Sequence, residues 1–143
     1  MPTIKDLLKQ KNRKLITVSS SVSIFDALKI MAEANIGCLI VLESDRYVGM
    51  FTERDYARKI VLEGRSSDKT TVNEIMISDI PILNLNDTIE QCSKIMTENT
   101  IRYLPVFEND QLVNVISQSD IIKYTIDLQK SLIEHLQTYM NLK

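Results

Sequence analysis

The chain contains an internal duplication, and this constrains its fold more than any other feature. Residues 18–55 align with residues 83–120 at a constant offset of 65, without a gap, and twelve of the 38 pairs are identical. A shorter upstream match pairs residues 3–8 with residues 71–76 at an offset of 68. A unit of roughly 60 residues seldom buries enough apolar surface to be stable alone. We therefore expect the two copies to pack together and to leave a ligand-binding cleft at their seam.

Composition narrows the class of protein. The 143 residues are 44% hydrophobic and 25% charged, with a formal net charge of −2. These values suit a globular chain that is one compact domain or a tight pair of half-domains, and they favour neither a nucleic-acid nor a membrane partner. No apolar run approaches the roughly 20 residues of a membrane span. The first residues lack a signal-peptide pattern, so we expect a cytoplasmic protein.

Residue types that support catalysis or bind metals are scarce. Cys38 and Cys92 lack metal-ligand spacing, and we predict that both are buried apolar residues. The one histidine, His135, and the three glycines form neither a zinc site nor a phosphate loop. Asp55 and Asp120 are candidates for acid–base chemistry, but no activated nucleophile accompanies them. We predict that the protein is not an enzyme and has no catalytic cofactor.

Each copy has the same order of signals, β-α-β-β-α, after an amphipathic lead-in, which predicts a mixed α/β (α+β) fold. Apolar runs predict strands, and periodic apolar residues predict helices between polar caps. The expected strands are 15–18, 38–42 and 47–51, then 80–83, 103–107 and 112–116; helices are expected from residue 24 to about 35, over 89–99, and from near Thr52 and Ser117. The expected boundaries are repeat 1 over 3–62, a linker over 63–71, repeat 2 over 72–126 and a C-terminal segment over 127–143.

The C-terminal segment predicts an additional amphipathic helix. Its apolar residues recur at spacings of three and four, at Leu128, Leu132, Leu136, Tyr139 and Met140. This spacing suits a helix that packs on the chain's own core and equally a helix that contacts a second copy. Both alternatives remain open at the level of sequence.

The strongest chemical signal stands at the start of the last helix of each copy. Copy one has Thr52 followed by Asp55, and copy two has Ser117 followed by Asp120. One interpretation is a helix cap, because a hydroxyl and an acid satisfy the first backbone N–H groups. The other is a nucleotide site, because a helix N-terminus binds phosphate and a carboxylate accepts hydrogen bonds from ribose hydroxyls.

Together these features resemble the cystathionine-β-synthase (CBS) domain family in its tandem form, the Bateman module. The resemblance covers about residues 3–126 and rests on the element order, the duplication, the Leu104-Pro105-Val106 strand and the Gly-h-x-[Ser/Thr]-x-x-Asp corner. The stretches 51–60 and 64–67 resemble small stand-alone CBS-pair proteins of bacteria and plant organelles. The resemblance implies two repeats related by a pseudo-twofold axis and a ligand that contains adenosine.

The resemblance also implies two candidate binding sites. In the first, Asp55 would hold the ribose, Thr52 an oxygen of the ribose or phosphate, and the backbone of Ile16, Thr17, Val18, Asn35, Ile36, Gly37 and Cys38 the adenine. In the second, Asp120 and Ser117 take those roles, and the base would lie against Ile80, Pro81, Ile82, Ile101, Arg102, Tyr103 and Pro105.

Cations near these sites would bind a phosphate, and Arg54, Arg58 and Arg102 are the candidates, although each is equally compatible with a solvated surface position. Copy two departs from the family pattern at Asn114, where copy one has Gly49, and Arg102 replaces Gly37. Copy one has Ile40 at the position of Pro105. We therefore expect the first site to bind better than the second.

These features predict a non-enzymatic adenine-nucleotide sensor. AMP is the first expected ligand, NAD the second and ATP the third. We expect a homodimer through the CBS helices and an unidentified client protein. The alternative is a dimeric scaffold that regulates another, possibly redox-active, protein without binding a nucleotide.

Overall fold

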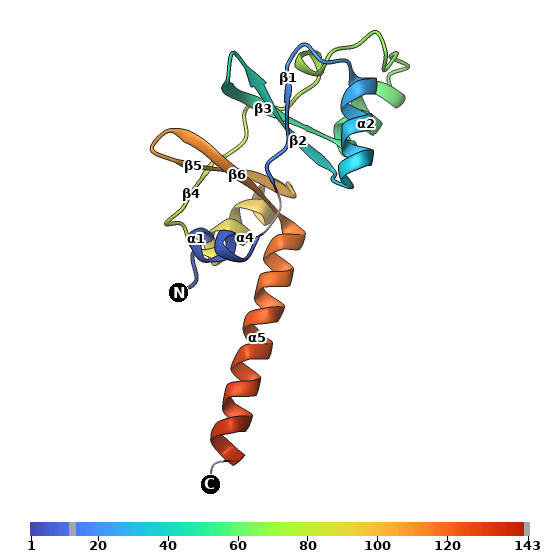
Figure 1. Ribbon diagram of the computed structural model, residues 1–143. Helices are drawn as coiled ribbons and strands as arrows, with labels where there is room; N and C mark the ends of the chain where they lie inside the picture. The colour runs from blue at the N-terminus through green and yellow to red at the C-terminus, as the bar shows by residue number, and fades with distance from the viewer. Residues whose placement is uncertain (12–13, 142–143) are drawn as a thin grey trace. The chain divides into compact units, whose positions relative to one another are not determined.

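The computed structural model describes residues 1–11 and 14–141, which fall into two compact units (Figure 1). The first unit is Lys14–Pro81, and the second unit combines Met1–Arg13 with Ile82–Lys143. Each unit holds one three-stranded sheet, with strand orders β1-β2-β3 and β4-β5-β6. The predicted mixed α/β fold is confirmed.

The sheet of the first unit is built from β1 (Thr17–Ser19), β2 (Cys38–Glu43) and β3 (Arg46–Thr52). Strand β1 runs parallel to β2, and β2 runs antiparallel to β3. The first four residues of the central strand β2 are all buried, as its continuous apolar sequence predicts. The β2–β3 turn places Ser44 and Asp45 at positive φ, a conformation typical of a two-residue hairpin.

The sheet of the second unit repeats this plan with β4 (Leu83–Asn84), β5 (Tyr103–Glu108) and β6 (Gln111–Ser117). Strand β4 is parallel to β5, and β5 is antiparallel to β6. Asn109 and Asp110 form the equivalent turn at positive φ.

One helix connects the parallel strands of each unit, and the two helices begin at residue 24 and residue 89 as predicted, each behind a hydroxyl cap. Helix α2 (Ile24–Ala34) is capped by Ser23, whose hydroxyl accepts from the Asp26 N–H. Helix α4 (Ile89–Asn99) is capped in the same way by Thr88. Their inward residues are buried and lie three and four apart: Ile24, Ala27 and Met31, and Ile89, Cys92 and Met96.

The lead-in segments are exchanged between the two repeats. Helix α1 (Ile4–Gln10) precedes the first repeat in sequence, yet its Ile4 N–H donates to Asp87 O at 2.8 Å in the second unit. The 3-10 turn η2 (Val72–Glu74) precedes the second repeat, yet its Val72 N–H donates to Val22 O at 2.8 Å. Val72 and Ile75 join the core of the first unit. Each compact unit therefore contains the lead-in of the other sequence repeat.

Two strands begin later than the sequence predicts. Strand β1 starts at Thr17 rather than at residue 15, and β4 starts at Leu83 rather than at residue 80. Thr17 pairs with Ile40, but the equivalent residue in β5 is Pro105, which has no N–H, and β4 pairs only with Val106 and Phe107. The proline thus accounts for the shorter parallel ladder of the second sheet.

The helical segments that follow strands β3 and β6 differ in length and type. After β3 comes a short α-turn, α3 (Glu53–Asp55), and then one stretch of π-helix, η1 (Tyr56–Val61). After β6 comes a single helix of 24 residues, α5 (Gln118–Asn141). This helix runs without a break through residue 126, where the sequence places the end of repeat 2, so the additional C-terminal helix is a continuation of the last helix of that repeat. Residues 142 and 143 of the predicted segment lie outside the described part.

Helix α5 does not pack on the chain's own core beyond its first turns. Its buried residue is Ile121, whereas Leu132 is 60% exposed and Met140 is 71% exposed. Figure 1 shows the helix extending away from the second sheet. Among the described residues, no helix combines the length and the apolarity that crossing a membrane requires.

Candidate functional site

Each sheet brings the predicted site residues to one of its edges. Because β1 and β2 are parallel, Thr17 and Cys38 both lie at the strand beginnings, and the antiparallel β3 ends beside them at Thr52. The Glu53 N–H donates to Gly37 O at 3.1 Å and ties the helix start to the residue before β2. In the second unit, the Gln118 N–H donates to Arg102 O at 2.8 Å in the same way. We call these two places the first corner and the second corner.

The first corner is a complete capping box. The Thr52 N–H and the Thr52 hydroxyl both donate to Asp55 Oδ2 at 3.0 Å, and the Asp55 N–H donates to Thr52 Oγ1 at 3.2 Å. Asp55 is only 4% exposed. The helix-cap interpretation is therefore confirmed for this pair, and it uses one of the two carboxylate oxygens.

The second oxygen of Asp55 faces a lysine that the sequence did not single out. Lys59 Nζ lies 3.4 Å from Asp55 Oδ1, one helical turn further along the chain. The same ammonium donates to Ile75 O at 3.0 Å, in the lead-in of the other repeat. Since each carboxylate oxygen can accept two hydrogen bonds, Oδ1 retains the capacity for a ligand hydroxyl beside a cation.

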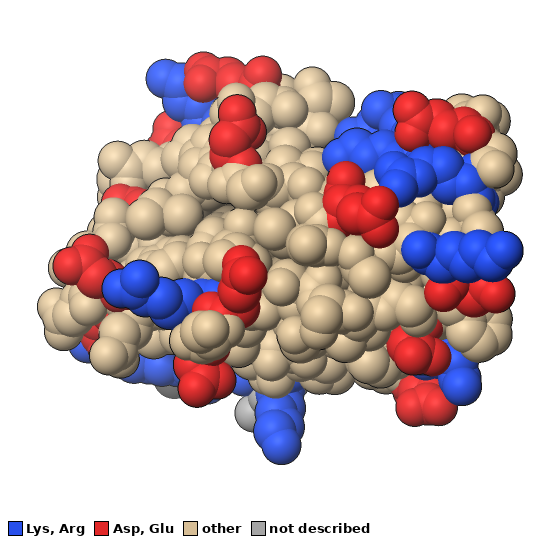
Figure 2. Space-filling view, turned by 90° about the horizontal axis from the view of Figure 1, so that it is seen from above, with Lys and Arg blue, Asp and Glu red and all other residues tan. Residues whose placement is uncertain are grey.

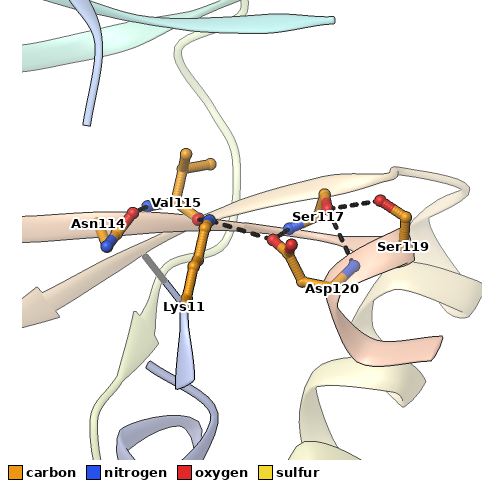
Figure 3. Close-up of polar contacts among 6 residues, drawn as sticks. All are labelled: Lys11, Asn114, Val115, Ser117, Ser119 and Asp120. Carbon is orange, nitrogen blue, oxygen red and sulfur yellow. Dashed lines mark hydrogen bonds and ion pairs between the residues drawn. The ribbon is translucent and has the colours of Figure 1, made fainter. Parts of the chain in front are cut away.

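At the second corner, the Ser117 N–H donates to Asp120 Oδ2 at 2.8 Å and the Asp120 N–H donates to Ser117 Oγ at 3.1 Å (Figure 3). The Ser117 and Ser119 hydroxyls are 2.9 Å apart. Lys11 Nζ lies 3.1 Å from the same Asp120 Oδ2 and also contacts Val115 O. The lysine and aspartate side chains are 11% and 22% exposed. A cation from the exchanged lead-in is thus paired with the carboxylate of this corner.

The protonation of Asp120 reflects these contacts. Burial alone would raise the pKa of its carboxyl group, but hydrogen bonds from Ser117 and the charge and hydrogen bond of Lys11 outweigh burial and hold the pKa below its ordinary value. Asp120 is therefore ionised at neutral pH.

Among the described residues, Lys11 takes the place in the second unit of a backbone contact that the first unit makes. There the N–H and C=O of Met50 and of Ile77 bond each other at 2.9 Å, which requires Gly49, since a Cβ at that position would lie 2.6 Å from Ile77 O. The position equivalent to Gly49 is Asn114, whose side-chain oxygen accepts from the Val115 N–H at 2.8 Å. The carbonyl of Val115, equivalent to that of Met50, then receives Lys11 Nζ. Gly49 thus serves close backbone approach.

A groove of about 580 Å³ adjoins the second corner, within the second unit. Its lining combines two ammonium groups, two carboxylates and one phenol ring, from Leu7, Gln10, Lys11, Ser119, Asp120, Lys123, Tyr124 and Asp127. The sequence did not predict that helix α1 would contribute to it.

The remaining predicted residues lie as follows. Val18, Cys38 and Pro105 are buried, Ile16, Ile36, Gly37, Ile101 and Tyr103 are half-buried, and Thr17, Asn35, Arg54, Arg58, Pro81, Ile82 and Arg102 are exposed. Ile80, which is half-buried, and Pro81 belong to the first unit rather than to the unit of Asp120. Cys38 and Cys92 are free, buried thiols, as predicted. Burial raises the pKa of Cys92 to about 12.

Charges are mixed on the face shown in Figure 2, where basic and acidic side chains alternate and do not gather into one basic patch. Lys11 and Lys59 form ion pairs with the corner carboxylates, whereas the three predicted arginines are exposed. Lys59 could have been found from its i,i+4 spacing to Asp55. Lys11 could not, because no sequence signal places the N-terminal segment beside copy two.

The capping motif alone does not identify a ligand site. Thr3 and Asp6 form the same box at the start of α1, with bonds of 2.9, 3.1 and 3.3 Å. What distinguishes the first corner is its surroundings, namely a nearly buried carboxylate, a paired lysine and two strand beginnings at one sheet edge.

Comparison with known proteins agrees with this architecture. The family model described as "CBS domain" matches residues 3–62 and 72–127. A CBS-domain protein of Arabidopsis thaliana described as mitochondrial, CBSX3, is 29% identical over 96% of this chain and 71% of its own length. YhcV of Bacillus subtilis is 31% identical over 85% of this chain and 84% of its own. The crystal structure of a protein with CBS domains from Burkholderia ambifaria superposes with a TM-score of 0.84, at 40% identity over 87% of this chain and 94% of that one. The chain belongs to the CBS domain family, as a pair of CBS repeats with a long C-terminal helix.

Proposed function

We propose that this chain is a non-enzymatic regulatory module that binds an adenine nucleotide at the first corner. CBS pairs form a family of regulatory modules, many of them nucleotide-binding. The observation that carries the proposal is the Asp55 carboxylate, which is nearly buried at a sheet edge and keeps one oxygen directed to Lys59 rather than to the helix cap. A ribose diol can donate to that oxygen, and the ammonium lies within reach of an attached phosphate.

The first corner is the better candidate because the second already holds a cation of the chain itself. A ribose that binds Asp120 must share or displace Lys11, which contacts both Asp120 and Val115. Arg102 also stands where the first corner has Gly37. AMP fits the single Lys59 beside Asp55 most simply, NAD follows, and ATP is third because its triphosphate needs more cations.

The ligand acts in this proposal by shifting a conformational equilibrium. Lys59 connects Asp55 to Ile75 O, so a nucleotide that engages either group changes the contact that holds the exchanged lead-in. Only a ligand that binds with different affinities to the conformations with and without the Lys59–Ile75 contact can produce such a shift. We also propose a cytoplasmic homodimer that contacts its second copy through α2 and α4 and passes the signal to a client protein.

One observation favours a second candidate, a dimeric scaffold without a nucleotide. The box at Thr3 and Asp6 has the same geometry as the first corner and serves only to start a helix. If the first corner does no more than that, the module regulates a partner, possibly a redox protein, by contact alone.

Calorimetric titration with AMP, NAD and ATP separates the two candidates. We expect saturable binding of AMP by the wild type and a 10- to 100-fold weaker affinity for Asp55→Asn, because hydrogen bonds to a charged group contribute about 1.5–3 kcal/mol. Asparagine keeps one oxygen for the Thr52 cap but presents an amide where the ribose would donate.

Asp6→Asn is the matched control, because it alters an identical capping box away from the corner. Its affinity for AMP should equal that of the wild type. Absence of binding for all three nucleotides, or equal affinities for Asp55→Asn and Asp6→Asn, would reject the nucleotide site in favour of the scaffold.

A further inference from the structure

Helix α5 presents large apolar residues to solvent along almost its whole length. They are between 45% and 71% exposed: Ile122, Ile126, Leu128, Leu132, Ile133, Leu136, Tyr139 and Met140. Because the helix has 24 residues, it is about 36 Å long at about 1.5 Å per residue. Scattered exposed apolar residues are ordinary, but a continuous stripe of this length marks an interaction surface.

The stripe has the spacing of a coiled-coil seam. Ile126, Ile133 and Met140 are seven residues apart, and Ile122, Gln129 and Leu136 form the interleaved series, also seven apart. Consecutive members of the combined series are four and three residues apart. Ile126 and Ile133 in one series, with Leu136 in the other, match part of the pattern that favours two parallel strands. The opposite face carries Ser131 and Thr138 and is polar.

We propose that this seam packs against α5 of a second copy of the chain, in parallel and in register. This proposal is independent of the nucleotide site and of the contact through α2 and α4. Residues Ile122, Ile126, Gln129, Ile133, Leu136 and Met140 would form successive layers, with Leu132 widening the contact on one side.

Two observations favour a second copy over an unrelated partner. Gln129 interrupts the apolar series once, and only a parallel, in-register partner with the same sequence places an identical amide opposite it; a single polar layer of this kind fixes register. The described helix also carries two lysines and three acids, so its charges nearly balance and do not favour an oppositely charged partner.

The available area approaches that of a standard specific interface. If a fully exposed large side chain contributes roughly 150 Å², the half-exposed residues of the seam offer on the order of 600 Å² in each copy. A standard specific interface buries about 800 Å² in each partner, and the stems of flanking Lys123 and Lys130 add to the apolar total.

Disulfide trapping in the full chain tests the contact and its orientation together. We expect Leu136→Cys to form a covalent dimer under mild oxidation, because the two copies of residue 136 meet in one layer. Thr138→Cys, on the polar face of the same helix, should stay monomeric on a non-reducing gel. The natural thiols do not interfere, since Cys38 and Cys92 are 5% and 0% exposed. Equal trapping of both variants, or none of Leu136→Cys, would overturn the proposal.

Sedimentation equilibrium provides a measurement that does not depend on cysteine chemistry. The double variant Ile133→Glu/Leu136→Glu should weaken self-association at least about 100-fold relative to Ser131→Glu/Thr138→Glu, which adds the same charge to the opposite face. Circular dichroism confirms that both remain folded. Equal association constants would contradict the seam, and AMP titration of the same variants reports separately on the corner, whose residues are unchanged.

Discussion

Two lysines determine how the two corner carboxylates differ. Lys59 comes from the helix that follows Asp55 and leaves the cap intact, whereas Lys11 comes from the exchanged lead-in and bonds the same oxygen that caps α5. At the first corner the lysine therefore pairs with the oxygen that is free of the cap, and at the second corner it pairs with the capping oxygen. The chemistry of each corner therefore follows from a residue outside the Thr/Ser-x-x-Asp motif.

Lys11→Met should lower the free energy of unfolding by about 1–3 kcal/mol at pH 6, because it removes hydrogen bonds to a partly buried charged group. The Asp120 carboxyl has a depressed pKa in the folded state, so its contribution is present above the unfolded pKa of about 3.9 and is lost as the pH falls through the folded pKa. The free energies of unfolding of the wild type and of Lys11→Met should therefore become more similar as the pH falls below about 3.9.

Urea unfolding at pH 6 and pH 3 measures this difference. Lys5→Met, at an exposed position of the same helix, is the control and should leave stability nearly unchanged. In an Asp120→Asn background, Lys11→Met should lower the free energy of unfolding by much less than it does in the wild type. A pH-independent loss, or the same loss in that background, would show that Lys11 stabilises the protein through Val115 O or through packing and not through Asp120.

At the scale of elements, α2 and α4 end in the same left-handed turn with different residues. Asn35 ends α2 at φ 54°, and Thr100 ends α4 at φ 53°. Asparagine tolerates this conformation, but a β-branched residue is strained there. The second repeat thus carries strain that the first does not.

Two single substitutions at these positions should change the free energy of unfolding in opposite directions. Thr100→Asn should raise the free energy of unfolding by about 1 kcal/mol, and Asn35→Thr should lower it by about as much. Denaturant unfolding with unchanged slopes is the check. Stabilisation by neither, or by both, would mean that side-chain contacts and not backbone strain decide the stability of these turns.

The elements that the sequence predicts well are those fixed by local patterns. The caps and apolar spacing of α2 and α4 and the hairpins around residues 45 and 110 depend only on neighbouring residues. The convergence of Thr52, Gly37 and Thr17 follows from strand order once the repeat is recognised.

Features that depend on contacts between distant segments could not be predicted. The exchange of lead-ins, and with it the pairing of Lys11 with Asp120, has no periodic or spacing signal. The sequence analysis expects a separate helix after repeat 2, but no helix-breaking residue stands near residue 126 and α5 continues through it.

For the whole molecule, exchange of the lead-ins means that each compact unit is completed by a segment of the other repeat. Polar contacts near both corners reach those segments, through Lys59 to Ile75 and through Lys11 to Asp120. The nucleotide proposed for the first corner would therefore act on a contact that belongs to both repeats. Together with the proposed self-association through α5, this contact would give the chain a route to a signal.

Hydrogen–deuterium exchange of the full chain, with and without saturating AMP, tests the central claim most directly because it locates the ligand on the protein. We predict slower exchange at residues 16–18, 35–38 and 52–55 in the wild type and a much smaller effect in Asp55→Asn, while residues 3–6 change equally little in both. Saturating AMP that leaves exchange at residues 52–55 unchanged would contradict a nucleotide site at the first corner.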